Sequence, residues 1–154
     1  MDRSEGGAEA GLDRILNRET FFYLLDMEVK RSRRYQNFFS VLVLRFYQLF
    51  GEDNSGKLLN CSNHLTQLMQ GEFRESDVLA SLGGNTLVAL LPFADESAVS
   101  KVRSHFESSL ESCDLKNKGY DVRINQVCFP MDGTSSRDLI RNIIGPEATQ
   151  DRRR

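Results

Sequence analysis

Residues 74–92 of this 154-residue chain read RESDVLASLGGNTLVALLP and decide its fold. Within that stretch, two apolar runs at 77–82 and 86–92 flank two glycines and an asparagine. Glycine and asparagine tolerate the positive φ angles of a tight turn between paired strands. Arg74 lies just before the first run, and Asp77 begins it. The stretch therefore predicts a β-hairpin that is entered through an Arg-x-x-Asp tetrapeptide.

The sequence around the hairpin alternates between helical and extended patterns. After Asn17, a favourable N-cap residue, apolar side chains at Phe21, Leu25 and Val29 repeat at helical spacing. The element order α-β-α-β-β-α-β-α predicts an α+β fold with a central, mainly antiparallel sheet flanked by helices. The other expected elements are helices over 57–70, 96–111 and 136–144, and strands over 38–47 and 120–129.

Composition indicates one domain between two tails. A hydrophobic content of 40% is enough for a core, and a net charge of -2 does not favour nucleic acid as a partner. Residues 1–11 and 145–154 are polar and rich in glycine or arginine, so we expect flexible tails around a domain at 12–144. No apolar run approaches the roughly 18 residues that span a bilayer. A cytoplasmic protein without a membrane partner is expected.

Isolated cysteines and histidines do not predict a metal site. The three cysteines form no CxxC pair, which argues against a disulfide framework or a zinc site. His64 and His105 have no cysteine or acid at ligand spacing, so we expect them to face solvent on helices. Cys61 has no evident basic partner and is expected to be a small packed side chain.

The motifs together resemble the GGDEF family of diguanylate cyclases, which condense two GTP molecules into cyclic di-GMP. The signature hairpin of that family reads Gly-Gly-Asp/Glu-Glu-Phe, and a regulatory Arg-x-x-Asp motif often lies five residues upstream. Arg74 and Asp77 fit that motif, and five residues separate Asp77 from Gly83 and Gly84. The resemblance implies the palm-type architecture of nucleotide cyclases. It extends to Asn17, Arg18 and Phe21 with Leu25 and Glu28, to Arg34 and Tyr35, and to Pro130, Asp132 and Gly133 with Leu139.

The chain departs from the family at the positions that would hold metal. Asn85, Thr86 and Leu87 replace the acidic residue, the glutamate and the phenylalanine of the signature. By register, Arg45 falls where the first strand normally ends in a metal-binding aspartate, and Tyr47 falls where a second acid is common. Two Mg²⁺ ions at the GTP phosphates need hard oxygen ligands, and phosphoryl transfer depends on them. We therefore expect no catalytic residues, no bound Mg²⁺ and no synthase activity.

The resemblance implies a ligand site at Arg74 and Asp77, where family members bind their product. A guanidinium matches guanine O6 and N7 or a phosphate, and a carboxylate accepts from guanine N–H groups. Cyclic di-GMP carries two phosphates, so a second cation is expected, with Lys57, Arg103 and the arginines of the first helix as candidates. The opposing interpretations are a local salt bridge of an i, i+3 pair and an ancestral remnant without ligand.

Two functions from different classes remain open. The first is a receptor for cyclic di-GMP that signals through a surface read by a partner protein. The second is a nucleotide-independent interaction domain that uses its helical faces to form a homodimer or to hold a partner. Residual GTP binding is a third, weaker alternative. The first two make opposite predictions for a cyclic di-GMP titration.

Overall fold

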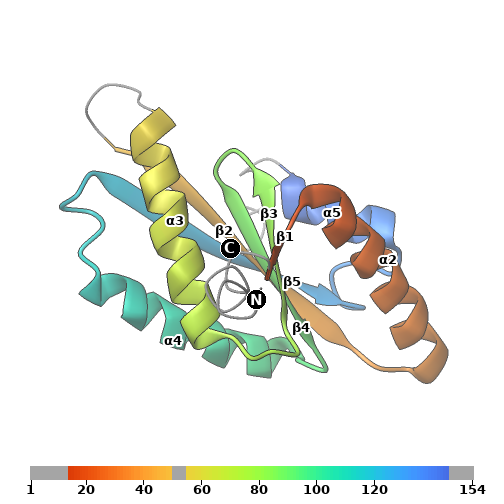
Figure 1. The fold of residues 1–154 in the computed structure, drawn as a ribbon. Helices are drawn as coiled ribbons and strands as arrows, with labels where there is room; N and C mark the ends of the chain where they lie inside the picture. Colours follow the sequence, from red (N-terminus) through yellow and green to blue (C-terminus); the bar gives the residue numbers. More distant parts are fainter. Residues whose placement is uncertain (1–13, 50–54, 146–154) are drawn as a thin grey trace, which may run out of the picture.

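The computed structural model describes residues 14–49 and 55–145 (Figure 1). The predicted tails at 1–11 and 145–154 lie outside these ranges, apart from Gly145. Within the described ranges, no helix has the length and apolar character that a membrane span requires. The elements are β1 (Ile15–Leu16), α2 (Arg18–Tyr35), β2 (Phe39–Gln48), α3 (Ser55–Glu72), β3 (Val78–Gly83), β4 (Thr86–Pro92), α4 (Glu96–Ser112), β5 (Tyr120–Phe129) and α5 (Ser136–Ile144).

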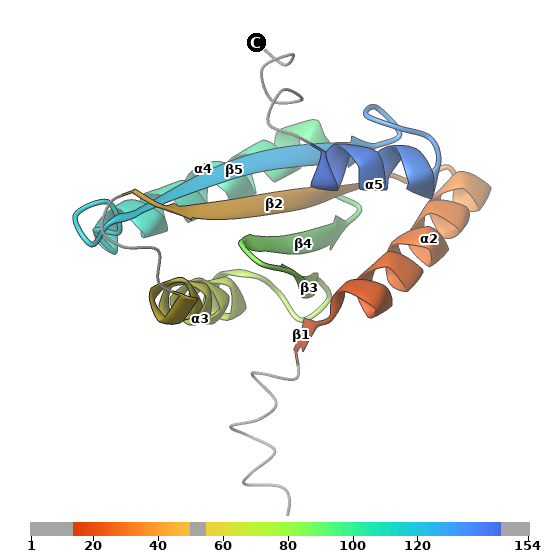
Figure 2. The ribbon, with the colours of Figure 1, turned by 90° about the horizontal axis from the view of Figure 1, so that it is seen from above.

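A five-stranded sheet forms the centre of the fold, in the order β1-β3-β4-β2-β5. Figure 2 shows β5, β2, β4 and β3 following one another across the sheet. β3 and β4 form the predicted hairpin, and β2 runs antiparallel to both β4 and β5. The predicted α+β fold with a mainly antiparallel sheet is confirmed. The sequence did not predict β1, which pairs in parallel with β3 through only two residues. Two residues are too few for an apolar periodicity to be visible.

Helices cover both faces of the sheet and create two core layers. In Figure 1, α3 and α4 lie on one side of the sheet and α2 and α5 on the other. Alternate side chains of a strand point to opposite faces. In β2, Leu42 and Leu44 therefore pack in the layer beneath α3 and α4, whereas Val41 and Val43 pack beneath α2 and α5. Burial on both faces explains the continuous apolar run of the predicted central strand.

Side-chain caps fix where the helices begin. The Asn17 side chain accepts a hydrogen bond from the Thr20 N–H at 2.8 Å, which confirms the predicted N-cap of α2. Asp95 caps α4 in the same way, by accepting from the Ala98 N–H at 2.8 Å. Each cap satisfies a backbone donor that has no partner within the helix.

The Pro-x-Asp-Gly turn connects β5 to α5 tightly. Asp132 Oδ2 accepts from the Cys128 N–H at 2.8 Å, and the Asp132 carbonyl accepts from Asn142 Nδ2 at 2.6 Å. A Cβ atom on Gly133 would lie 2.8 Å from Cβ of Asp138, closer than real Cβ contacts. Glycine is therefore needed at 133 because α5 packs directly against the turn.

Candidate functional site: the Arg74–Asp77 turn

Arg74 and Asp77 form a closed turn between the end of α3 and the start of β3. The Asp77 Oδ2 atom accepts from the Arg74 N–H at 2.8 Å, and the Asp77 N–H donates to the Arg74 carbonyl at 3.0 Å. One hydrogen bond to the Asp77 side chain and one between backbone groups therefore connect the two residues. The local salt-bridge interpretation requires an ion pair between the two side chains. Within residues 14–49 and 55–145, the structure has no ion pair between Arg74 and Asp77.

Burial and charge act in opposite directions on the Asp77 carboxyl group. Partial burial raises its pKa above the ordinary value, because a charged group loses hydration there. The hydrogen bond from the Arg74 N–H and the positive charges of Arg74 and Arg14 lower the pKa again, with smaller effects. The carboxylate is thus partly desolvated, and an added hydrogen-bond donor would stabilise its charged form.

Arg14 fastens the turn from the side of β1. Its guanidinium donates to the carbonyl oxygens of Gln70 at 3.3 Å, Phe73 at 3.4 Å and Arg74. Gln70 lies in the last turn of α3 and Phe73 directly follows the helix, where backbone acceptors lack partners within the helix. One cation next to β1 therefore holds both the helix end and the turn.

A pocket of about 420 Å³ opens beside the turn. Arg74 and Asp77 line this pocket, here called the turn pocket, together with side chains of α4 that include Lys101 and His105. Among the described residues, neither the Arg74 guanidinium nor the Lys101 ammonium forms a hydrogen bond or an ion pair. The pocket therefore presents two cations without a partner among the described residues and one partly desolvated carboxylate.

Lys101 is a cation in the lining of the turn pocket that the sequence did not single out. Arg103 does not line the turn pocket, and its guanidinium pairs with Glu107 at 3.2 Å on the surface of α4. The arginines of α2 do not line it either. Lys57 carries no described side chain. Lys101 could be found only by knowing which turn of α4 faces the end of α3.

Glu72 joins α3 to α4 at the same pocket. Its Oε1 lies 3.0 Å from Nε2 of His105, and its Oε2 accepts from the Ser109 hydroxyl at 2.8 Å. His105 is 74% exposed and His64 is exposed too, as predicted for both. Cys61 is buried, and burial raises the pKa of its thiol to about 11, which agrees with the predicted packing role.

The signature hairpin lies at the other end of β3 from the turn. Gly83 and Gly84 adopt φ angles of 97° and 58°, which glycine accepts without steric cost. The Asn85 carbonyl accepts from the Phe46 N–H at 3.1 Å, so the hairpin is hydrogen-bonded to β2. Leu87, in the last signature position, is buried beneath α3 and α4.

Arg45 and Thr86, at two positions where the sequence predicts lost metal-binding carboxylates, are neighbours in the sheet. They pair directly where β2 runs antiparallel to β4. The Arg45 guanidinium donates to the carbonyl oxygens of Ile143 and, at 3.5 Å, of Gly145. These carbonyls end α5, where a cation complements the helix dipole. The sequence predicted a lost metal position at Arg45, but it did not reveal this contact.

The start of α2, with its Asn-Arg-x-x-Phe motif, also contacts the hairpin. Arg18 donates to the Leu82 carbonyl at 3.2 Å, and its guanidinium lies 5.2 Å from the ring centroid of Phe22. Phe21 is fully buried in the layer beneath α2 and α5. The Asn-Arg-x-x-Phe motif thus combines a helix cap, a hairpin contact and a core side chain.

Comparison with known proteins assigns the family. The profile of the family described as "Diguanylate cyclase, GGDEF domain" matches residues 11–143. The chain therefore belongs to the GGDEF family. None of the curated protein sequences compared with the chain matches it.

Several solved structures share the fold. A DGC protein from Thermotoga maritima is 11% identical, with a TM-score of 0.71 over 86% of this chain and 95% of that one. The active GGEEF domain of a diguanylate cyclase from Vibrio cholerae is 13% identical, with a TM-score of 0.68 over 90% and 92%. The coiled coil and GGDEF domain of DgcB from Caulobacter crescentus, in complex with c-di-GMP, is 12% identical, with a TM-score of 0.65 over 90% and 77%.

Proposed function

We propose that this GGDEF domain is a cyclic di-GMP receptor without synthase activity, and that it binds the ligand in the turn pocket. The observation that carries the proposal is that Arg74, Asp77 and Lys101 line one pocket, in which neither cation has a partner among the described residues. The DgcB structure with bound c-di-GMP supports the choice of ligand, since it has the same fold.

The chemistry of the three side chains fits a dinucleotide with two guanines and two phosphates. Arg74 offers a planar fork of donors for guanine O6 and N7 or for a phosphate. The second oxygen of Asp77, Oδ1, has no hydrogen bond within the described part of the chain and can accept from the N–H groups of guanine. Lys101 supplies a second positive charge for the other phosphate. Each role uses a group that the fold leaves available.

The proposed lack of synthase activity follows from Arg45 and Thr86. Mg²⁺ prefers carboxylate ligands, and a neutral hydroxyl binds it poorly. A guanidinium fixed to the end of α5 adds a positive charge where the family would hold a cation. We expect no cyclic di-GMP when the protein is incubated with GTP and Mg²⁺. Product above the level of a protein-free control would refute this half of the proposal.

Calorimetric titration with cyclic di-GMP tests the receptor half. Arg74→Ala should weaken binding by about tenfold or more, because hydrogen bonds to charged groups contribute about 1.5–3 kcal/mol. Arg103→Ala is the matched control, since it removes an arginine of α4 that lies outside the pocket and is paired with Glu107. It should bind like wild type. Folded wild-type protein that produces no heat at high ligand concentration would refute the receptor function.

A second candidate, an interaction domain that binds no nucleotide, is favoured by the outer surface of α2. Tyr23, Met27 and Tyr35 of this helix are 65%, 47% and 62% exposed. Aromatic residues and methionine are enriched in protein interfaces. This function predicts a protein that fails to bind cyclic di-GMP and forms a concentration-dependent dimer in sedimentation experiments. A monomer at all concentrations would count against self-association.

A further inference from the structure

Phe93, between β4 and α4, combines two unfavourable features. Its φ angle is 61°, a region that residues with a side chain rarely adopt, and its ring is 57% exposed. Hydrogen bonds on both sides hold it there: the Phe93 N–H donates to the Phe38 carbonyl at 3.0 Å, and the buried Ser40 hydroxyl donates to the Ala94 carbonyl at 2.8 Å. Held conformations of this kind concentrate at functional sites.

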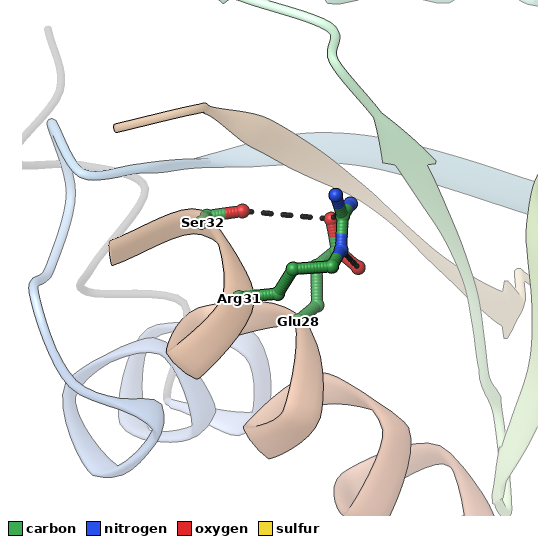
Figure 3. A network of polar contacts seen from close by, with 3 residues as sticks. All are labelled: Glu28, Arg31 and Ser32. Atoms are coloured by element: carbon green, nitrogen blue, oxygen red, sulfur yellow. Dashed lines mark hydrogen bonds and ion pairs between the residues drawn. The ribbon is translucent and has the colours of Figure 1, made fainter. Parts of the chain in front are cut away.

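Arg31 of α2 supports the Phe93 ring. Its guanidinium carbon lies 5.1 Å from the ring centroid, within the range of a cation–π contact. Glu28 fixes that guanidinium through an ion pair and also accepts from the Ser32 hydroxyl at 3.5 Å (Figure 3). The Glu28 side chain is only 15% exposed, so this network is partly shielded from solvent. The position of the Phe93 ring is therefore fixed by its hydrogen-bonded backbone and by the Arg31 guanidinium, which Glu28 holds in place.

The ring borders the turn pocket. Phe93 lines it together with Arg74, Asp77 and Lys101, whereas Arg31 lines a separate pocket between α2 and the hairpin. The supporting cation thus approaches from outside the turn pocket. An aromatic surface is available next to the groups proposed to read the edge of a guanine.

We propose that Phe93 is a stacking platform for a guanine base of the ligand in the turn pocket. This inference rests on the proposed receptor function and adds to it a residue that contributes affinity. Arg74 and Asp77 would recognise the edge and a phosphate, and Phe93 would cover the face of the base. Stacking on an aromatic ring contributes strongly to the affinity for a base. It does so for any base, because every base has a π face. Arg31 acts as a positioning residue beneath the platform.

Substitution of the ring separates this inference from the receptor function. Phe93→Leu keeps an apolar side chain but removes the π face, and it should weaken cyclic di-GMP binding about 5- to 100-fold in calorimetry. Tyr23→Leu is the matched control, since it removes a ring that is 65% exposed and lies outside the lining of the turn pocket. It should bind like wild type. Wild-type affinity in Phe93→Leu, with binding lost in Arg74→Ala, would overturn the platform alone. Failure of the wild type to bind would overturn the receptor function itself.

A fluorescent variant gives an independent measurement. The chain contains no tryptophan, so Phe93→Trp introduces a single indole at the platform. Stacking of a guanine on this indole should quench its emission in step with the calorimetric saturation. The double variant Phe93→Trp/Arg74→Ala should show no quenching at the same ligand concentrations. Unchanged emission in Phe93→Trp at calorimetric saturation would overturn the platform.

Discussion

Arg45 stands directly opposite Thr86 in the antiparallel pairing of β2 with β4, and its guanidinium reaches across to the Ile143 carbonyl at the end of α5. The two positions at which the sequence predicts lost metal-binding carboxylates are therefore adjacent in this fold, and one of them carries a structural cation. That cation connects the sheet to the last helix.

Removal of the Arg45 guanidinium should destabilise the fold. Arg45→Met leaves the last carbonyls of α5 without their donor and should lower the free energy of unfolding by about 1–2 kcal/mol. Urea denaturation followed by circular dichroism measures the difference. Arg137→Met is the control: Arg137 is exposed on α5 and forms no hydrogen bond or ion pair with described residues. It should stay within about 0.5 kcal/mol of wild type, and equal stability of both variants would contradict the role of Arg45.

Ligand binding should weaken as the pH falls, because Asp77 must be ionised to accept hydrogen bonds from guanine. Burial raises the Asp77 pKa, so the loss should begin at a higher pH than for an ordinary aspartate. Below that folded-state pKa, affinity should fall by roughly tenfold per pH unit. Asp77→Asn should bind more weakly at neutral pH and lose this dependence. His105 and Glu72 are further ionisable residues that line the same pocket. Cyclic di-GMP binding by His105→Gln and Glu72→Gln is therefore measured over the same pH range, as a control for these two groups. Affinity independent of pH in the wild type would contradict the role of Asp77.

The raised pKa of Asp77 affects folding stability in the direction opposite to its effect on ligand binding: stability should fall as the pH rises. A folded-state pKa above the unfolded value means that Asp77 stabilises the fold below the unfolded pKa, and that this contribution is lost as the pH rises through the folded pKa. Asp77→Asn should therefore gain stability relative to wild type as the pH is raised through that window. Urea midpoints measured across the window test this, and a constant difference between the two proteins would contradict it.

Two glycine-to-alanine substitutions should change stability in opposite directions. Gly133→Ala places a Cβ 2.8 Å from Cβ of Asp138 and should cost about 1–3 kcal/mol through overpacking. Gly71→Ala, on the exposed side of α3, meets no atom within 4 Å and should stabilise the helix by up to about 1 kcal/mol. Thermal denaturation of both variants checks the prediction. A Gly133→Ala protein as stable as wild type would contradict the prediction, because the turn and α5 would then have moved apart to admit the Cβ atom.

The sequence predicted the elements whose signals are local. The apolar spacing of Phe21, Leu25 and Val29, the cap at Asn17 and the glycines of the hairpin each act within a few residues of one another, so each can be recognised without the fold. Strand β1 escaped prediction because its two residues gain their structure from β3 alone.

The candidate site was only partly predictable for a related reason. Arg74 and Asp77 are close in sequence and could be identified together. Lys101 and Phe93 lie beside them only once α4 has packed next to the turn. The tripeptide Phe93-Ala94-Asp95 contains no pattern that predicts the positive φ of Phe93. The contact of Arg45 with Ile143 spans 98 positions, and no local pattern encodes it.

Arg14 connects strand β1 to the Arg74–Asp77 turn, so amide hydrogen exchange in these two segments should be coupled. Its guanidinium bonds to the carbonyls around the turn, and the adjacent β1 pairs with β3 through only two residues. A short edge ladder of this kind opens locally far more easily than the core. Because the edge and the turn share one anchor, they should open as one cooperative unit. A ligand that grips Arg74 should then slow amide hydrogen exchange at Ile15 and Leu16, although it touches neither residue.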